Sequence, residues 1–501
     1  MSATPWAAIA DTYRRHLPPG TLRRFRVDGL DRLGIPVVTA RLLRDGGASI
    51  EGIGYGATAD EALVGALGEL SEEAHADRAL AAMPRVEASF EALRRVHGAG
   101  GVLDPATVCL PAGSGWRPDR PLAWLEGHRL ADGEPVWVPE CLACESPSQL
   151  RARRPPLVVP ITNGLGAGLC RAQAVVHGLL ELLQRDGNVL SYRALDQGIA
   201  VDLDAVADPE VRRLVALYRA AGIDVLAKVA STDFGLANVY VVGDDRRLDG
   251  AAGDLPLRLT ACGEAVHPDR ERALRKALLE FAGSRARKSF RHGPLERIAA
   301  VAPPGYLERV LPGIDPEREE PRALAALIDW LGADAPLLRR LLADRGILAV
   351  RETRPLEALP TVPPGSADAP EARLALVVAR LAEAGLEPIA VDFSPPGGAV
   401  HAVKAIVPGL ESETLSYHRI GERGVRRLLD RGSPLVRVAP GGAPADGGFR
   451  RVVLTADAEH RLGGAAWLDT DALDALVGAL YPLYREPSGH SAQVALARRH
   501  A

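Results

Sequence analysis

The chain has 501 residues, and its 60 Lys and Arg against 64 Asp and Glu give a formal net charge of −4. This length allows two or three domains, or one large unit with internal duplication, and a substantial buried core. The near balance of charge creates no overall field that would favour nucleic acid or an anionic membrane, so we expect neither as a partner.

The N-terminus has no basic region followed by an apolar run, and no stretch of about 18 uncharged apolar residues occurs anywhere in the sequence. The five cysteines are sparse and odd in number, which fits a reducing compartment and argues against a disulfide framework. Cys141 and Cys144 form a CxxC motif without a second ligand pair, so we expect buried structural thiols. We therefore expect a cytoplasmic protein.

Hydrophobic patterns of period 2 and period 3.6 predict strands and helices that interleave without a regular βαβ order. We therefore expect an α+β fold, with mixed and antiparallel sheets flanked by helices. In chain order, the expected strands lie around Phe25 and at 36–43, 136–140, 156–161, 223–230, 237–243, 256–262, 388–393 and 399–407. The expected helices lie at 5–16, the second half of 48–80, 86–96, 171 to about 194, 207–221, 269–288, 321–345, 371–386 and 418–431.

One pattern occurs three times, at 62–69, 174–181 and 273–280: a small residue, three others, a second small residue, Leu, one other residue and Glu. These offsets place both small residues and the Glu on one face of a helix. A glycine-bearing segment precedes each copy and suits a turn that approaches a ligand closely. The pattern predicts pseudo-repeated units whose glutamates, Glu69, Glu181 and Glu280, share a polyanion and metal site.

Neighbouring charges extend this interpretation. Glu72 follows Glu69 at a spacing of three, so the two carboxylates repel unless a cation lies between them; a solvated acidic face is the alternative. Arg275 and Arg285 belong to a basic helix that is either a cationic surface or a phosphate-neutralising element. Together with Arg185, they make a nucleoside triphosphate with Mg²⁺ the expected guest. The sequence contains no P-loop motif.

These motifs resemble those of the YcaO family. Residues 162–186 resemble its central signature, 52–73 and 261–285 its first and third, and 402–411 its C-terminal strand and turn. The resemblance covers about residues 46–430 and implies the YcaO-type fold over that range. We therefore expect an N-terminal extension at 1–45, a catalytic domain at 46–430 and a C-terminal segment at 431–501.

The resemblance implies ATP and Mg²⁺ as cofactors and the activation of a peptide backbone amide by O-phosphorylation, followed by nucleophilic attack on the amide carbon. By position in the motifs, it implies that Asn163 and Arg185 contact the nucleotide. The metal ligands that it implies are Glu69, Glu72, Glu181 and Glu280. It assigns no catalytic nucleophile.

The product implied is an azoline, a thioamide or an amidine, formed in the maturation of a ribosomally synthesised peptide. The chain ends without the proline-alternating tail common in azoline-forming members and has little sequence ahead of the first motif, which favours a separate partner protein or a non-azoline outcome such as thioamidation. That partner would be a leader-binding ThiF-like or a TfuA-like protein, and a homodimer is compatible with the sequence. Two alternatives are a non-catalytic nucleotide-binding scaffold subunit and an enzyme that modifies a small-molecule amide.

Four positions depart from the family's pattern. Tyr55 stands where a Lys is common, Glu73 replaces a basic residue, Gln184 replaces a glutamate, and Gly283 replaces a Gln. Gln184 retains hydrogen-bonding capacity but carries no charge, so one Mg²⁺ is expected to be held more weakly or differently.

Overall fold

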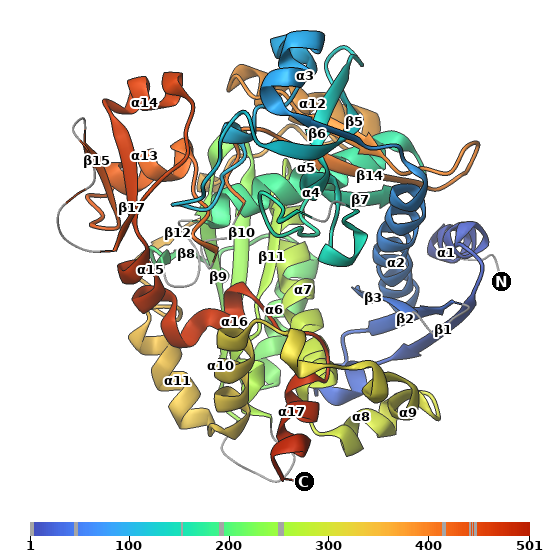
Figure 1. Cartoon of the computed structure of the whole chain (residues 1–501). Helices are drawn as coiled ribbons and strands as arrows, with labels where there is room; N and C mark the ends of the chain where they lie inside the picture. The colour runs from blue at the N-terminus through green and yellow to red at the C-terminus, as the bar shows by residue number, and fades with distance from the viewer. Residues whose placement is uncertain are drawn as a thin grey trace.

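The computed structural model describes residues 5–44, 49–151, 154–189, 195–248, 255–412, 417–439, 442, 444 and 448–500. Within these ranges, four sheets lie among helices (Figure 1). The first sheet has the order β1-β2-β3: Thr21–Arg26, Val37–Leu43 and Ser49–Tyr55. The second has the order β11-β10-β9-β8-β12: Gly263–His267, Ala237–Asp245, Ile223–Ser231, Ile199–Val201 and Glu352–Arg354.

The third sheet has the order β4-β5-β13-β14-β7, with β6 paired to β5: Val86–Ser89, Pro121–Arg129, Ile389–Asp392, His401–Ile406, Leu165–Gly168 and Pro135–Pro139. The fourth has the order β15-β17-β16: Val436–Ala439, Ala465–Asp469 and Phe449–Arg451. Antiparallel pairing dominates, and β12 pairs with β8 in parallel. The expected α+β fold with mixed and antiparallel sheets is confirmed.

The helices that matter most for the site are α2 (Ala59–Ala82), α5 (Arg171–Asn188) and α7 (Arg270–His292). The remaining longer helices are α1 (Pro5–His16), α3 (Phe90–His97), α6 (Pro209–Ala220), α10 (Pro321–Gly332), α11 (Ala335–Asp344), α12 (Pro370–Glu383), α13 (Glu422–Asp430), α15 (Thr470–Val477) and α17 (Ser491–His500). The shorter ones are α4 (Glu140–Ala143), α8 (Leu295–Val301), α9 (Tyr306–Val310), α14 (Ala456–Leu462) and α16 (Tyr481–Tyr484).

Each of the three repeated motifs forms a strand followed by a helix that packs directly on it: β3 with α2, β7 with α5, and β11 with α7. A strand glycine makes each approach possible. A Cβ added to Gly54 would overlap the Ala62 carbonyl oxygen and the Ala66 nitrogen of α2. Gly166 stands in the same relation to α5, and Gly263 to α7. The small residues of the repeated pattern therefore form the helix surface against which the strand backbone lies.

Several expected elements differ from the structure. The helix expected at 321–345 is divided into α10 and α11, which are separated at residues 333–334. Residues 156–161 form no strand, because prolines at 155, 156 and 160 lack the N–H that a ladder needs, although Leu157 and Val158 are buried. Residues 256–260 form a 3₁₀-helix that begins at Pro256, and the strand starts only at Gly263. The expected helix at 86–96 begins as strand β4.

Some expectations lie outside the described residues. The helix expected to reach about 194 is described to Asn188, and positions 190–194 are not described. The same holds for much of the Gly/Pro-rich segment at 438–449.

The C-terminal segment contains β15–β17 with α14, and then α15, α16 and α17, which run from the lower left of the view to its bottom in Figure 1; α17 packs against α7 and α10. Cys141 and Cys144 are buried free thiols, as expected.

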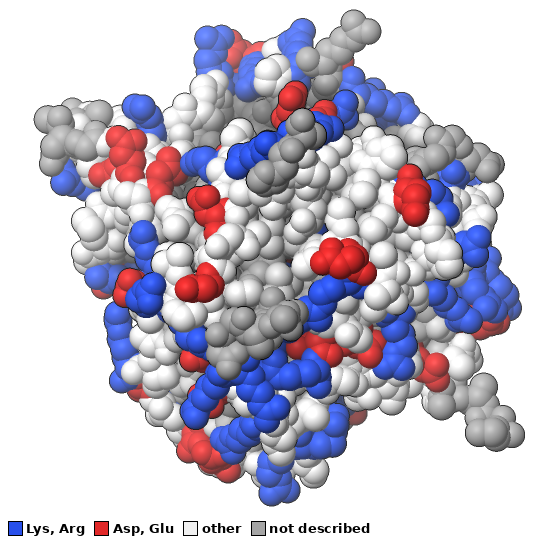
Figure 2. Space-filling view, turned by 90° about the horizontal axis from the view of Figure 1, so that it is seen from below, with Lys and Arg blue, Asp and Glu red and all other residues white. Residues whose placement is uncertain are grey.

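In the described part of the chain, every helix is too short or too polar to cross a membrane. Seen from below, Lys and Arg side chains gather over the lower half of the face with acidic side chains among them (Figure 2).

Gly54→Ala is expected to lower the free energy of unfolding by about 1–3 kcal/mol, because the added methyl group must push α2 away from β3. Gly332→Ala is the control, since a Cβ there meets no atom within 4 Å and the residue ends helix α10. Urea unfolding of both variants measures the difference. Equal stability of the two variants would contradict the proposed close packing.

Candidate functional site

The three repeated helices open onto one cavity of about 610 Å³. Glu69 from α2, Glu181 from α5 and Glu280 from α7 all line it. The structure therefore brings together the three glutamates that the repeated pattern selects. The other lining residues are Ile53, Tyr55, Ile161, Thr162, Asn163, Arg185, Thr260, Cys262, Glu264, Gly283, Ser284, Arg287, Lys288, Arg291, Tyr417, Pro482, Leu483, Tyr484, Arg485 and Glu486.

Backbone amides that precede the repeated helices orient two of these carboxylates. The Ile53 N–H donates to Glu69 Oε2 at 2.6 Å, and the Gly164 N–H donates to Glu181 Oε2 at 2.8 Å. Both donors belong to the glycine-bearing segment ahead of the corresponding helix. The segment that lets the helix approach thus also fixes its glutamate.

Glu280 is held differently, by a side chain from the first motif. The Tyr55 hydroxyl donates to Glu280 Oε2 at 2.7 Å, and the Tyr55 ring lies so close to Gly283 that an added Cβ would come within 2.8 Å of it. The two departures at positions 55 and 283 are therefore adjacent in space. The Tyr55 ring occupies the space that a side chain at position 283 would need.

Glu72 does not line the cavity but lies just behind it. The Ala167 N–H donates to its Oε1 at 3.0 Å. Burial, reinforced by the nearby charges of Glu181 and Glu69, raises the pKa of Glu72 to about 8. Its carboxylate is thus part of the same electrostatic group as the lining glutamates.

Two of the lining carboxylates, Glu69 and Glu280, are costly to ionise. Burial, opposed by Lys276 and reinforced by Glu264, raises the pKa of Glu280 to about 7. Burial likewise raises the pKa of Glu69. Negative charge collected in a buried cavity is stabilised by a cation, and this donor set of carboxylates fits Mg²⁺.

Among the described residues, no group of three or more His, Cys, Asp or Glu side chains is arranged tightly enough to enclose a metal ion by itself. Mg²⁺ usually keeps several waters and phosphate oxygens alongside one or two carboxylates. The spread arrangement therefore fits a metal held jointly by Glu69, Glu181, Glu280 and the phosphates of a nucleotide, rather than a closed protein cage.

Arg185 and Asn163, the expected nucleotide contacts, both line the cavity. The Arg185 guanidinium lies between two carboxylates, 3.4 Å from Glu181 Oε1 and 3.0 Å from Glu264 Oε2. The Asn163 amide donates to the Ser412 carbonyl oxygen at 3.1 Å. Sequence reasoning missed Glu264, although it follows the glycine that introduces the third motif.

Arg275 and Arg285 do not line the cavity, so the expectation that they neutralise phosphate is corrected. Arg285 is fully buried, where it donates to Asp31 at 2.7 Å and to Asp245 at 2.7 Å. Arg275 points to the N-terminus of α6 and donates to Asp208 at 2.9 Å. Helical spacing identified the basic helix but could not tell which of its faces meets the cavity.

The cations of α7 that do line the cavity are Arg287, Lys288 and Arg291, further along the helix, and Arg485 joins them from the C-terminal segment. Glu486 from the C-terminal segment contacts the first two at 3.0 and 3.5 Å. Burial alone would raise the pKa of Glu486, but Arg287 and Lys288 hold it well below its usual range. No sequence motif identified the segment that contains Glu486, because its contact with the cavity depends on tertiary packing.

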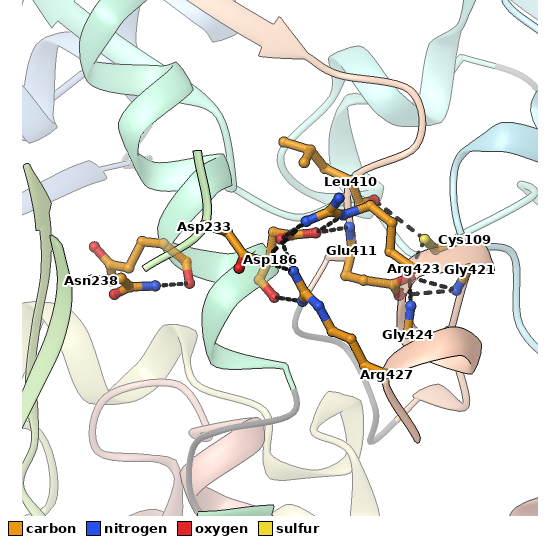
Figure 3. A network of polar contacts seen from close by, with 11 residues as sticks. Cys109, Asp186, Asp233, Asn238, Leu410, Glu411, Gly421, Arg423, Gly424 and Arg427 are labelled. Carbon is orange, nitrogen blue, oxygen red and sulfur yellow. Dashed lines mark hydrogen bonds and ion pairs between the residues drawn. The ribbon is translucent and has the colours of Figure 1, made fainter. Parts of the chain in front are cut away.

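The end of α5 is anchored on the side away from the cavity by an ion network (Figure 3). Asp186 is fully buried, and its carboxylate accepts from Arg423 at 3.0 Å and from Arg427 at 2.9 Å, both on α13. Its Oδ1 also accepts from the Glu411 N–H at 3.0 Å. Since Asp186 follows Arg185 directly, the network fixes the helix turn that presents Arg185 to the cavity.

Arg285→Met is expected to lower the free energy of unfolding by about 3–5 kcal/mol, because Asp31 and Asp245 would keep buried charges without their partner. Nucleotide affinity should stay near the wild-type value. Arg185→Met is the comparison variant and should weaken nucleotide binding with a smaller loss of stability, because Glu264 keeps Gln184 and Asn188 as donors. Chemical unfolding and calorimetric titration measure the two effects, and a large loss of affinity in Arg285→Met would restore its expected role.

The raised pKa of Glu72 predicts a pH-dependent stability in Mg²⁺-free buffer. A carboxyl with a folded pKa of about 8 and an ordinary value of 4.5 contributes stability that is complete below 4.5 and is lost as pH rises through 8. Glu72→Gln should therefore raise the Tm at about pH 9 more than at about pH 5. Thermal unfolding at both values with a chelator measures this, and an equal change at both would refute the assignment.

A family model described as a YcaO cyclodehydratase that binds ATP and Mg²⁺ matches residues 53–411. An uncharacterized protein in the tfuA 3′ region of Rhizobium leguminosarum bv. trifolii is 26% identical over 85% of this chain and 91% of its own length. The solved structure of YcaO from Methanopyrus kandleri, bound with AMPPCP and Mg²⁺, is 23% identical, with a TM-score of 0.55 over 83% of this chain and 92% of that one.

A heterocyclase in complex with substrate and cofactor is 18% identical, with a TM-score of 0.61 over 86% of this chain. This chain covers 55% of the heterocyclase chain. Both structures share the fold described above. The family match spans all three repeated motifs and their glutamates. The chain therefore belongs to the YcaO family, with ATP and Mg²⁺ as its cofactors.

Proposed function

We propose that this protein uses ATP and Mg²⁺ to activate a peptide backbone amide in the maturation of a ribosomally synthesised peptide. The observation that carries the proposal is the convergence of Glu69, Glu181 and Glu280 with Arg185 on one cavity. Carboxylates suit the metal, and the arginine suits phosphate oxygens. The relatives named above support a nucleotide as the guest.

In this proposal, Glu69, Glu72, Glu181 and Glu280 would hold Mg²⁺, which would supply neutralisation of the phosphate charge during phosphoryl transfer. Asn163 and Arg185 contact the nucleotide. The amide oxygen accepts the γ-phosphoryl group and ADP leaves. A nucleophile then attacks the amide carbon, and phosphate departs with the former amide oxygen. Phosphorylation thereby converts a poor leaving group into a good one.

The nucleophile decides the product. A neighbouring Cys, Ser or Thr side chain of the substrate gives an azoline, and an external sulfide equivalent gives a thioamide. The similarity to a protein in a tfuA 3′ region supports a TfuA-like partner and thioamidation as the second candidate. A ThiF-like leader-binding partner goes with azoline formation.

Glu181→Ala is expected to abolish Mg²⁺-dependent binding of a non-hydrolysable ATP analogue while the fold stays intact. Glu210→Ala is the matched control, because Glu210 also lies on a helix and pairs with an arginine one turn away, Arg213, outside the cavity. Isothermal titration with and without Mg²⁺ and circular dichroism measure the effects. Unchanged binding in Glu181→Ala would refute the proposed site.

A further inference from the structure

Glu264 of β11 meets the last turn of α5 at one edge of the cavity. Its Oε2 accepts hydrogen bonds from three side chains of that turn: Gln184 Nε2 at 3.0 Å, Arg185 Nη1 at 3.0 Å and Asn188 Nδ2 at 2.7 Å. The Glu264 side chain is only 8% exposed, so these donors stabilise a charge that burial would otherwise disfavour.

The Arg185 guanidinium reaches Glu264 with one nitrogen and Glu181 with the other. These two carboxylates have different tasks in the proposed function. A bound Mg²⁺ would draw on the Glu181 carboxylate, whose Oε1 also accepts from Arg185. Glu264 is then the carboxylate that still fixes the direction of Arg185 inside the cavity.

The turn is also held from the opposite side. Asp186 ties it to Arg423 and Arg427 of α13 through contacts that do not involve Glu264 (Figure 3). Loss of the Glu264 charge would therefore release the Arg185 side chain while the helix backbone stays anchored. The orientation of the Arg185 side chain and the stability of the fold can therefore be tested independently.

We infer that Glu264 is a positioning residue, which holds Arg185 toward the nucleotide phosphates while Glu181 binds the metal. The inference rests on the proposed function and deepens it. Gln184 completes the arrangement, because its amide donates to Glu264 where a second carboxylate would repel it. A single carboxylate, shared among three donors, thus supplies the charge at this corner.

Glu264→Gln is expected to weaken binding of Mg²⁺ with a non-hydrolysable ATP analogue about tenfold, the loss typical of one charge-assisted contact. In an Arg185→Met background, the same change should have little further effect, because Glu264 acts through Arg185. Glu140→Gln is the control: Glu140 is equally buried and pairs with Arg85 at 3.0 Å outside the cavity. Its affinity should match wild type, whatever its effect on Tm.

A charge exchange completes the test. Gln184→Glu combined with Glu264→Gln moves the carboxylate across the contact and keeps both donor and acceptor, so affinity should return to within about threefold of wild type. An unchanged affinity in Glu264→Gln, additive losses in the cycle, or no recovery in the exchanged variant would overturn the inference. Lack of binding by the wild-type protein would instead overturn the proposed function, and the inference with it.

Discussion

The arrangement of the site depends on how closely three helices approach the strands that precede them. Gly54, Gly166 and Gly263 leave no side chain between strand and helix, so each helix backbone rests on a strand backbone. At that distance, the Ile53 amide of β3 and the Gly164 amide just before β7 reach Glu69 and Glu181 directly. Close packing therefore stabilises all three units, and in the first two it also orients the carboxylate.

The same packing brings negative charges close together. Burial raises the pKa of Glu69, Glu72 and Glu280, so the group is poorly stabilised by protein contacts alone. Arg185 and the basic face of α7 offset part of this charge. A divalent cation bound together with an anionic ligand would complete this balance, in keeping with the proposed use of ATP and Mg²⁺.

Positions that look like separate departures in the sequence are neighbours in the fold. Tyr55 packs on Gly283 and donates to Glu280, while Gln184 donates to Glu264. Each pair combines a changed residue with a partner that complements its shape or charge. The changed residues thus fit their neighbours in the site. Position 184 lacks a carboxylate, and Glu264 provides one in contact with it.

The sequence alone determined the three repeated units, their helices and the glutamates that they share, because helical spacing and glycine turns act over a few residues. It also determined the α+β class. Only the tertiary structure decided that Arg285 is buried between Asp31 and Asp245, and that Glu264 and Glu486 reach the cavity. These facts depend on which helix face packs inward and where distant segments return, and local periodicity carries no information about either.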